Sequence, residues 1–273
     1  THRGHAGELG ARAAAEGYDA VVVHGGDGSV NEVVNGILGA PDRVDPVTSD
    51  QLPAVCVVPG GSANVFARAL GIDRDPIVAT AQLIDILDND RRRPISLGHT
   101  LNRWFLFNSG MGMDAIVVRM MEEKRRRGQK APAQRYLRTT LKAFFSPTIE
   151  PPTFTVEVPD HAPVEGVRFG FVSNAMPWTY LGRTAIRTNP NTDFDTGLGV
   201  FAATSVAIAR NLMLGGKLLS NSTDPKAAHL FRDDDVEWVK FHSPTPADVQ
   251  MDGDYLGEYT EMEFGCRRSV IDV

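Results

Sequence analysis

The sequence has few cysteines, no long apolar run and no excess of basic residues. Its 273 residues include only two cysteines, Cys56 and Cys266, too few for a disulfide framework and in keeping with a reducing cytosol. No apolar run approaches the roughly 20 residues that a membrane-spanning helix needs. Lys and Arg number 28 against 34 Asp and Glu, and the net charge of −6 argues against non-specific binding to nucleic acid. These absences favour a cytoplasmic enzyme without a nucleic-acid partner.

Two strand-turn-helix units occupy the N-terminal third of the chain. In the first, the β-branched run 18–24 leads into a glycine-rich turn and then into the amphipathic segment 30–37. In the second, the apolar run 54–58 leads into the turn 59–64 and a further helical segment. Short β-branched runs closed by glycines are typical of buried parallel strands. Successive units of this kind place both turns along one edge of a parallel sheet, where ligands of open α/β folds bind.

The first turn has the composition of a phosphate site. Gly25, Gly26 and Gly28 allow positive φ and close approach of a ligand, while the N–H groups at the start of a helix point toward a bound anion. Asp27 would repel a bare phosphate, and it therefore suggests a bridging Mg²⁺ or a water network. The same residues also suit an ordinary strand-to-helix turn, so the pattern alone leaves both interpretations open.

The second turn adds two polar side chains to the same edge. Ser62 can cap the following helix and can also donate to a phosphate, and Asn64 can face the same ligand. Ordinary capping explains Ser62 equally well. The two turns together predict a nucleotide site without proving one.

Several ordered blocks then resemble one family. They are residues 25–36, 59–70, 102–112, 195–198 and 249–254. In this order they span nearly the whole chain and resemble the catalytic domain of the diacylglycerol kinase and sphingosine kinase family, most closely the soluble bacterial diacylglycerol kinases. The resemblance implies an α/β nucleotide-binding domain with a parallel sheet, followed by a β-rich, sandwich-like second domain.

We expect the boundary between these domains near Arg93, which gives residues 1–93 and 94–273. An arginine run there ends the predicted helix 79–87, and short strand-like segments such as 236–241 and 261–264 follow. The last residues are expected to pack back on the first domain. The resemblance also implies an earlier strand with an Asn-Pro-x-Ser-Gly loop, so we expect an N-terminally truncated chain whose activity is impaired.

The resemblance implies transfer of the γ-phosphate of ATP to the hydroxyl of diacylglycerol, which gives phosphatidic acid. Asp27 would organise Mg²⁺ and thereby act in catalysis. The nucleotide contacts implied by position are Gly25, Gly26, Asp27, Gly28, Ser29, Asn31, Glu32, Gly61, Ser62 and Asn64.

A late Asp-Gly-Asp motif carries the candidate general base. The family reads Asp-Gly-Glu there, and this chain has Asp252, Gly253 and Asp254. Either carboxylate can face a cleft and accept a proton from a glycerol hydroxyl, and the sequence leaves the choice open. Asp-Gly between apolar residues is also a strong hairpin signal, so a purely structural turn is the alternative.

The resemblance further implies a structural metal ion at the turn before residue 198. Its ligands by position would be Asp193, Thr196 and Leu198. Thr196 stands where the family has a second Asp, and a neutral hydroxyl is a weaker ligand for a hard cation. An ordinary turn that leads into the strand 198–203 is the alternative.

A basic segment suggests how a lipid substrate is reached. Residues 124–130 are basic in an acidic chain and lie between apolar residues. Clustered cations beside apolar side chains hold a protein on anionic lipid at about 1 kcal/mol per charge. We therefore expect peripheral membrane association, with a solvated loop between helices at 115–123 and 133–145 as the alternative. Trp178 and Tyr180 are candidates for a lipid pocket or for the core, and the oligomeric state stays open, a homodimer included.

Two other functions remain open. An NAD kinase shares the Gly-Gly-Asp-Gly turn and a late β domain, although the continuation 31–36 resembles the lipid kinases. A lipid- or nucleotide-binding pseudokinase is the other, suggested by the missing first strand, Thr196 and Asp254. Mg-ATP binding without turnover would favour the pseudokinase.

Overall fold

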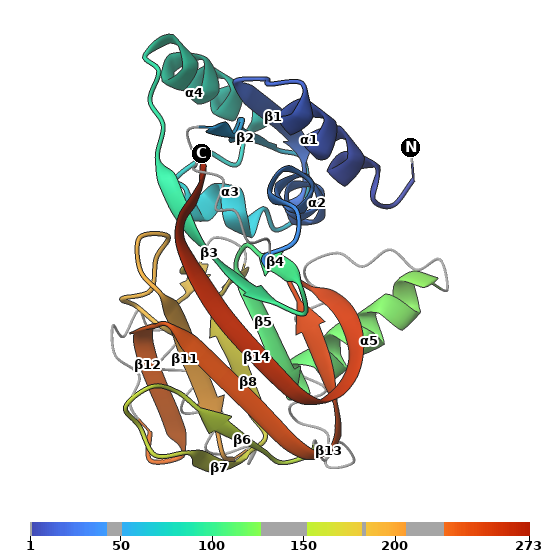
Figure 1. Ribbon diagram of the computed structural model, residues 1–273, viewed down its shortest axis with the longest axis vertical. Coiled ribbons are helices and arrows are strands. Elements are labelled where there is room, and N and C mark those ends of the chain that lie inside the picture. The colour runs from blue at the N-terminus through green and yellow to red at the C-terminus, as the bar shows by residue number, and fades with distance from the viewer. Residues whose placement is uncertain (1, 43–50, 127–151, 182–183, 206–226) are drawn as a thin grey trace.

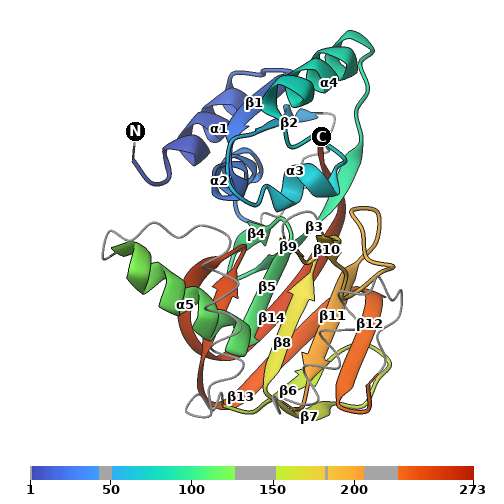
Figure 2. The same cartoon turned by 180° about the vertical axis from the view of Figure 1, so that it is seen from behind.

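The structure is a computed structural model that describes residues 2–42, 51–126, 152–181, 184–205 and 227–273 (Figure 1). An α/β part that holds the N-terminus sits on a large antiparallel sheet, and the view from behind shows the same two layers (Figure 2). The side chains of residues 124–130 and the predicted helix 133–145 lie outside the described residues. Among the described helices, none combines the length and apolar character needed to cross a bilayer.

The α/β part alternates helices with two parallel strands. Its elements are α1 (His5–Ala15), β1 (Ala20–Gly25), α2 (Asp27–Leu38), β2 (Ala54–Pro59), α3 (Val65–Ala69) and α4 (Pro76–Asp88). Strands β1 and β2 pair in parallel, with Val22 opposite Cys56, which confirms the predicted parallel sheet. Each strand ends in its glycine turn, and the Gly60 N–H donates to the Gly25 carbonyl across 2.8 Å. The pairing therefore holds the two turns side by side.

Helix α2 owes its position to a regular apolar face and to close glycine contacts. Val30, Val33, Val34 and Ile37 recur at helical spacing and are at most 5% exposed. Helix α1 also approaches α2 closely, because a Cβ at Gly10 would lie only 2.6 Å from the Val33 carbonyl oxygen. The fixed helix carries Asp27 in its first turn.

The second part is dominated by antiparallel strands. Its elements are β3 (Pro94–Thr100), β4 (Arg103–Phe105), β5 (Asn108–Gly112), α5 (Met113–Arg126), β6 (Phe154–Glu157), β7 (Val164–Val167), β8 (Phe169–Ser173), β9 (Thr179–Leu181), β10 (Thr184–Ile186), β11 (Leu198–Ala203), β12 (Leu230–Val236), β13 (Trp238–Met251) and β14 (Asp254–Asp272). Over the described ranges the main sheet runs β12-β11-β8-β5-β13-β14-β3-β4, with β6 on β13 and β7 on β6. These strands confirm the predicted β-rich second part.

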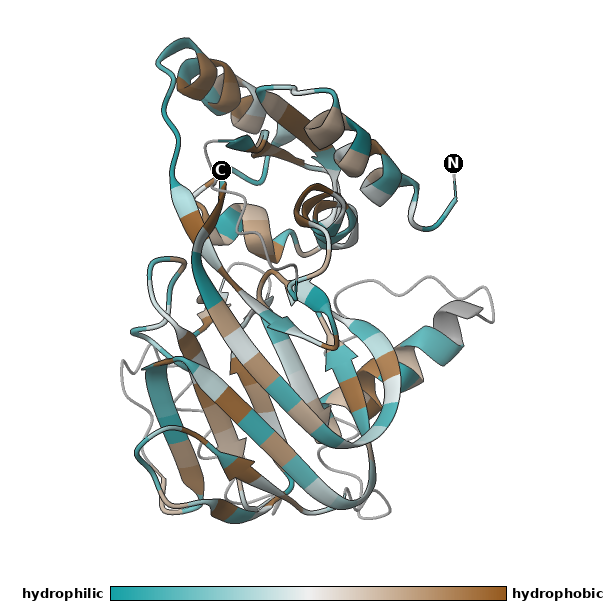
Figure 3. Ribbon diagram, in the orientation of Figure 1, coloured by the Kyte–Doolittle hydropathy of each residue, from teal (hydrophilic) through white to brown (hydrophobic). Residues whose placement is uncertain are grey.

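The long strands β13 and β14 differ from the short segments expected at 236–241 and 261–264. Hydrophobic and hydrophilic bands alternate along much of both strands (Figure 3), and Phe241 and Phe264 are fully buried on the inner side. Register shifts next to His242 and Val249, together with Gly257 at φ 115°, break the alternation that would have revealed one continuous hairpin.

Strands β3 and β14 connect the two parts. Ile95 and Ile271 are fully buried in the same core cluster as Val30 and Phe66 of the α/β part. The C-terminal strand thus contacts the core of the α/β part. The α/β elements end before β3 begins, next to the predicted boundary at Arg93, while the division into two independent domains stays a prediction.

We expect Gly10→Ala to destabilise the fold and Gly28→Ala not to do so. A methyl group at Gly10 meets the backbone of α2, whereas nothing lies within 4 Å of a Cβ at Gly28. Overpacking of this kind typically costs about 1–3 kcal/mol, while a helical Gly→Ala change in open space stabilises by about 0.4–1 kcal/mol. Thermal unfolding of the two variants measures the contrast. Equal melting temperatures would contradict the tight α1–α2 contact.

Candidate functional site

The two glycine turns form one continuous backbone surface. A Cβ at Gly61 would lie 2.7 Å from the Gly26 Cα, and a Cβ at Gly60 would lie 3.2 Å from the Gly25 Cα. Side chains at these positions would push the turns apart. The glycines therefore allow the ends of β1 and β2 to approach at the N-terminus of α2, where helical N–H groups attract anions.

Asp27 joins the first turn to the helix that follows the second. Its Oδ1 accepts the backbone N–H of Phe66 in α3 at 3.0 Å. Burial raises the pKa of the Asp27 carboxyl, and the N–H groups of Phe66 and Val65 oppose this rise. The carboxylate thus neutralises the start of α3 and fixes the spacing of the two turns.

The site fits a magnesium ion that arrives with phosphates. Within the described ranges no three His, Cys, Asp or Glu side chains gather into a site of their own. Mg²⁺ is commonly held by one or two carboxylates together with substrate phosphates. Asp27 is the carboxylate of the glycine turns that would serve such an ion, and backbone N–H groups of Phe66, Val65 and Asn64 surround it.

Besides Asp27, other predicted nucleotide contacts already have partners within the protein. Asn64, in the left-handed region at φ 47°, accepts the Gly61 N–H and donates to the Gly61 carbonyl, both at 2.9 Å. Asn64 is also the N-cap residue of α3, so the expectation that Ser62 caps this helix is wrong. Glu32 accepts the Gly4 N–H at 3.0 Å. Ser62 is exposed beside the turn.

Asn31 links α2 to the large sheet. It is 6% exposed, and its amide group donates to the Trp104 carbonyl at 3.1 Å and to Asp252 Oδ2 at 2.8 Å. The Asn31 amide group is therefore engaged at this junction. A contact between Asn31 and a nucleotide stays a prediction. Asn31 follows Asp27 by four residues, about 6 Å along a helix axis. The Asp252 turn therefore lies about one helical turn from the two glycine turns, which together are called the glycine cradle below.

Asp252 is held by four N–H donors. Oδ2 accepts from Asn31 and from the Leu106 backbone at 2.6 Å, and Oδ1 accepts from the backbone of Phe107 at 3.0 Å and of Asn108 at 3.1 Å. Burial raises the pKa of Asp252 to about 7, and these hydrogen bonds oppose the rise. All four partners donate, so the contacts are matched to the ionised form.

Asp254 has a different environment on the other side of the turn. Asp252 and Gly253 have φ of 49° and 81°, which is the two-residue hairpin that Asp-Gly predicted. The Asp254 side chain is 48% exposed, and its Oδ2 lies 3.3 Å from Arg3 Nη2. The structure therefore separates the two candidate bases into one saturated carboxylate and one accessible carboxylate.

A buried polar network behind this hairpin was missed by the sequence reasoning. Gln250 is 1% exposed and donates to Asp114 Oδ2 at 2.6 Å and to Asn108 Oδ1 at 2.8 Å. Burial raises the pKa of Asp114 to about 6, and the hydrogen bond from Gln250 opposes the rise. A polar residue two positions before Asp252 in an apolar strand was the available signal.

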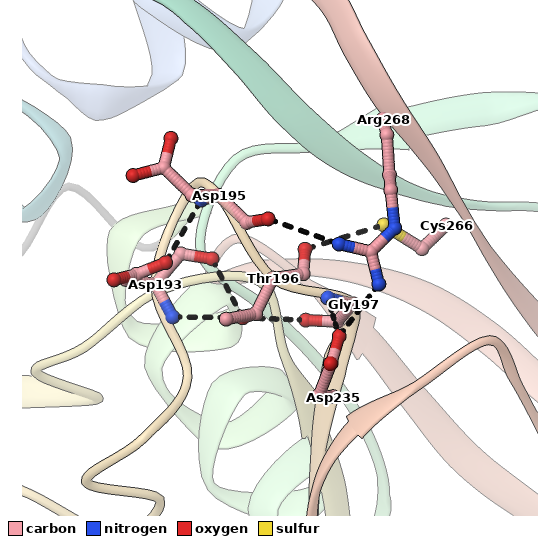
Figure 4. A network of polar contacts seen from close by, with 7 residues as sticks. All are labelled: Asp193, Asp195, Thr196, Gly197, Asp235, Cys266 and Arg268. Atoms are coloured by element: carbon pink, nitrogen blue, oxygen red, sulfur yellow. Dashed lines mark hydrogen bonds and ion pairs between the residues drawn. The ribbon is translucent and has the colours of Figure 1, made fainter.

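The turn that the resemblance linked to a metal ion is closed by hydrogen bonds (Figure 4). The Thr196 hydroxyl donates to the Asp193 carbonyl and accepts the Asp193 N–H, both at 3.0 Å. Asp193 Oδ1 also accepts the Asp195 N–H at 2.8 Å. Leu198 starts β11 next to this turn.

Arg268 of β14 supplies the positive charge at this turn. Its guanidinium donates to the Asp195 carbonyl at 3.0 Å and to Asp235 Oδ1 at 2.7 Å (Figure 4). Asp235 also accepts the Gly197 N–H at 2.6 Å, and this bond, followed by Arg268, lowers the pKa of Asp235. These oxygens already face N–H donors, so the residues present do not fit a structural metal ion.

Comparison with known proteins finds similarity in the N-terminal third of the chain. Residues 1–99 match the family model of the diacylglycerol kinase catalytic domain. A diacylglycerol kinase from Bacillus subtilis (strain 168) is 38% identical over 112 residues, which cover 41% of this chain and 33% of that protein. One from Staphylococcus aureus (strain Newman) is 37% identical over 95 residues, 35% of this chain and 26% of that protein. The matched parts thus span a third or less of these relatives.

Solved structures extend the likeness to the whole fold. The crystal structure of a diacylglycerol kinase from Bacillus anthracis str. Sterne aligns with 100% of this chain and 81% of its own, with a TM-score of 0.63 and 18% identity. A second structure from that organism covers 100% and 82%, with a TM-score of 0.74 and 19% identity. Fold and site define a two-part α/β protein with a glycine cradle beside a carboxylate hairpin. Residues 1–99 are similar to the diacylglycerol kinase catalytic domain, and the likeness of the remaining residues is one of fold.

We expect the Asp193–Gly197 turn to be stabilised by Arg268 rather than by a divalent cation. Arg268→Ala should lower the melting temperature by about 2–4 °C, because an exposed ion pair is worth about 1 kcal/mol. Arg267→Ala, which alters the exposed neighbour, is the matched control. Wild-type melting should not respond to EDTA or added Mg²⁺. A clear fall on chelation would contradict this account, since a bound metal stabilises by mass action.

The buried Asp114 carboxyl should make stability depend on pH. Its folded pKa of about 6 exceeds the ordinary value of 3.8, so the folded protein keeps a proton that the unfolded chain loses. Its contribution is therefore fully present below about pH 4 and is lost as pH rises toward about 6. Relative to wild type, Asp114→Asn should gain on the order of 2 kcal/mol between these pH values. Urea unfolding across this range measures the difference, and parallel pH profiles would contradict it.

Proposed function

We propose that this chain is an ATP-dependent lipid kinase that transfers the γ-phosphate to the hydroxyl of diacylglycerol and forms phosphatidic acid. The observation that carries the proposal is the contact between Asn31 and Asp252. It sets a carboxylate hairpin about one helical turn from a glycine cradle. A phosphate cradle with a nearby base is what transfer to a hydroxyl needs, since catalysis rests on positioning and charge stabilisation.

The cradle would hold the nucleotide phosphates through backbone groups. Gly25, Gly26, Gly28 and Ser29 lie at the start of α2, and the second turn adds Gly61 with the exposed Ser62. N–H groups at the start of this 12-residue helix favour anionic oxygens. Asp27 would hold Mg²⁺, which would supply positive charge to neutralise the transferred phosphate. Asn31, Asn64 and Glu32 would keep the cradle in shape.

Asp254 is the general base in this proposal. A base must present a free lone pair to the hydroxyl from which it takes the proton. The oxygens of Asp252 face four fixed donors, whereas Asp254 is half exposed with Arg3 as its ion-pair partner. The Asp254 carboxylate would accept the hydroxyl proton as the acceptor oxygen attacks the γ-phosphorus of ATP. The bond from the γ-phosphorus to the β–γ bridging oxygen would break, and ADP would leave. Asp252 would hold the hairpin on α2.

The acceptor would be presented by a membrane surface. The basic residues 124–130 would contact anionic lipid next to α5, in a protein that works in the cytoplasm as a peripheral enzyme. Tyr180 fits a pocket role less well than a packing role, because the Arg68 guanidinium lies 3.0 Å from its ring centroid. Trp178 stacks on Phe171 with ring centroids 5.2 Å apart and serves the core.

The two hairpin carboxylates have different roles in this proposal. We therefore expect an Asp→Asn change at Asp254 to affect kcat and one at Asp252 to affect stability. Asp254→Asn should lower kcat by about 10²–10⁴ and leave the melting temperature unchanged. Asp252→Asn should lower the free energy of unfolding by about 1–3 kcal/mol, because an amide N–H₂ would face N–H donors. The assay follows labelled γ-phosphate from ATP to diacylglycerol in mixed micelles. Full activity of Asp254→Asn would contradict its role as base.

The same assay separates the competing functions. Phosphate transfer to NAD, with none to diacylglycerol, would replace the lipid kinase by an NAD kinase. Binding of Mg-ATP without transfer to either acceptor would indicate a pseudokinase. Asp27→Ala is the informative partner variant, because it should abolish transfer under either kinase function.

A further inference from the structure

The side chain of Gln250 connects a buried carboxylate to the backbone of the hairpin turn. On one side its amide nitrogen donates to Asp114 Oδ2 at 2.6 Å, in the first turn of α5. On the other side its Oε1 accepts the Gly253 N–H at 3.0 Å. Gln250, Asp114 and Asn108 are at most 6% exposed, so water does not substitute for these partners.

The orientation of the Gln250 amide is decided by its neighbours. Asp114 Oδ2 and Asn108 Oδ1 both accept, so the amide nitrogen must point toward them. The amide oxygen is then directed at the Gly253 N–H. With the opposite orientation, two acceptors would face an oxygen and the Gly253 N–H would face a donor. An acceptor at residue 114 therefore fixes the hydrogen bond at the turn.

We propose that Asp114 is a positioning residue that acts through Gln250 to hold the Gly253 turn and so aim the Asp254 carboxylate. This inference rests on the proposed function for its kinetic consequence. Gly253 immediately precedes Asp254, and the Asp252 side of the turn is fixed separately by the donors from residues 106–108. The hydrogen bond from Gly253 to Gln250 fixes the other half of the turn.

The alternative is that these contacts serve packing alone. Variants distinguish the packing role from the positioning role. Asp114→Asn keeps the size of the side chain but offers Gln250 a donor as well as an acceptor, so the amide orientation is no longer fixed. A packing role predicts lower stability. A positioning role predicts lower kcat without lower stability at neutral pH.

The experiment is a double-mutant cycle of Asp114→Asn and Gln250→Met on the full chain. Each single variant should lower kcat about tenfold to a hundredfold, as expected for a displaced catalytic group, with KM for ATP unchanged. The double variant should match Gln250→Met, because Asp114 has no effect without the Gln250 amide. Ser109→Ala is the control, since the Ser109 hydroxyl donates to the Gln250 main-chain carbonyl, at 2.7 Å, and not to the Gln250 side chain. It should keep wild-type kcat.

A readout independent of activity completes the test. Hydrogen exchange of the Gly253 amide, followed by NMR, should accelerate in Asp114→Asn and in Gln250→Met but not in Ser109→Ala. Unchanged exchange in Asp114→Asn would overturn the proposal, and so would losses in kcat that add in the double variant. If wild type fails to phosphorylate diacylglycerol, the proposed function fails, while the exchange data still decide the positioning role. Should Gln250→Met not fold, Asp114→Asn against Ser109→Ala decides.

Discussion

The hydrogen bonding of the Asp252 carboxylate is the interaction on which the arrangement of the site depends. Its donors come from α2 and from the segment that leads into β5, two regions that are far apart in the sequence. A buried carboxylate is costly unless several donors satisfy it, so this contact forms only when the helix and the sheet are correctly placed. The same residue thereby fixes how far the hairpin lies from the glycine cradle.

One motif consequently performs two tasks. Asp252 is partly buried and bonded to groups on both parts of the molecule, whereas the side chain of Asp254, two residues later, is 48% exposed. The left-handed backbone of Asp252 and Gly253 sends the two side chains into these different surroundings. Behind the turn, Gln250 and Asp114 add a second support that reaches into α5. The accessible carboxylate is thus carried on a turn that is held from two sides.

Charge pairing within the chain also explains the turn before β11. A cluster of aspartates there would suit a divalent cation if its oxygens were free. Arg268 from β14 and Arg93, the residue before β3, approach it instead, and Arg93 Nη2 lies 2.6 Å from Asp195 Oδ2. One arginine lies in β14 and the other next to β3, so the pairing ties the turn to the strands that connect the two parts.

The sequence by itself determined the parallel strand-turn-helix units and the Asp-Gly hairpin, because β-branched runs and glycines act over a few neighbouring residues. It placed Asp27, Asp252 and Asp254 among the site residues but did not distinguish the two hairpin carboxylates. Only the tertiary structure decided that Asn31 bonds to Asp252, that Arg268 reaches the Asp193–Gly197 turn, and that Gln250 meets Asp114. These contacts join residues tens to hundreds of positions apart, and they depend on strand register and burial that local patterns do not encode.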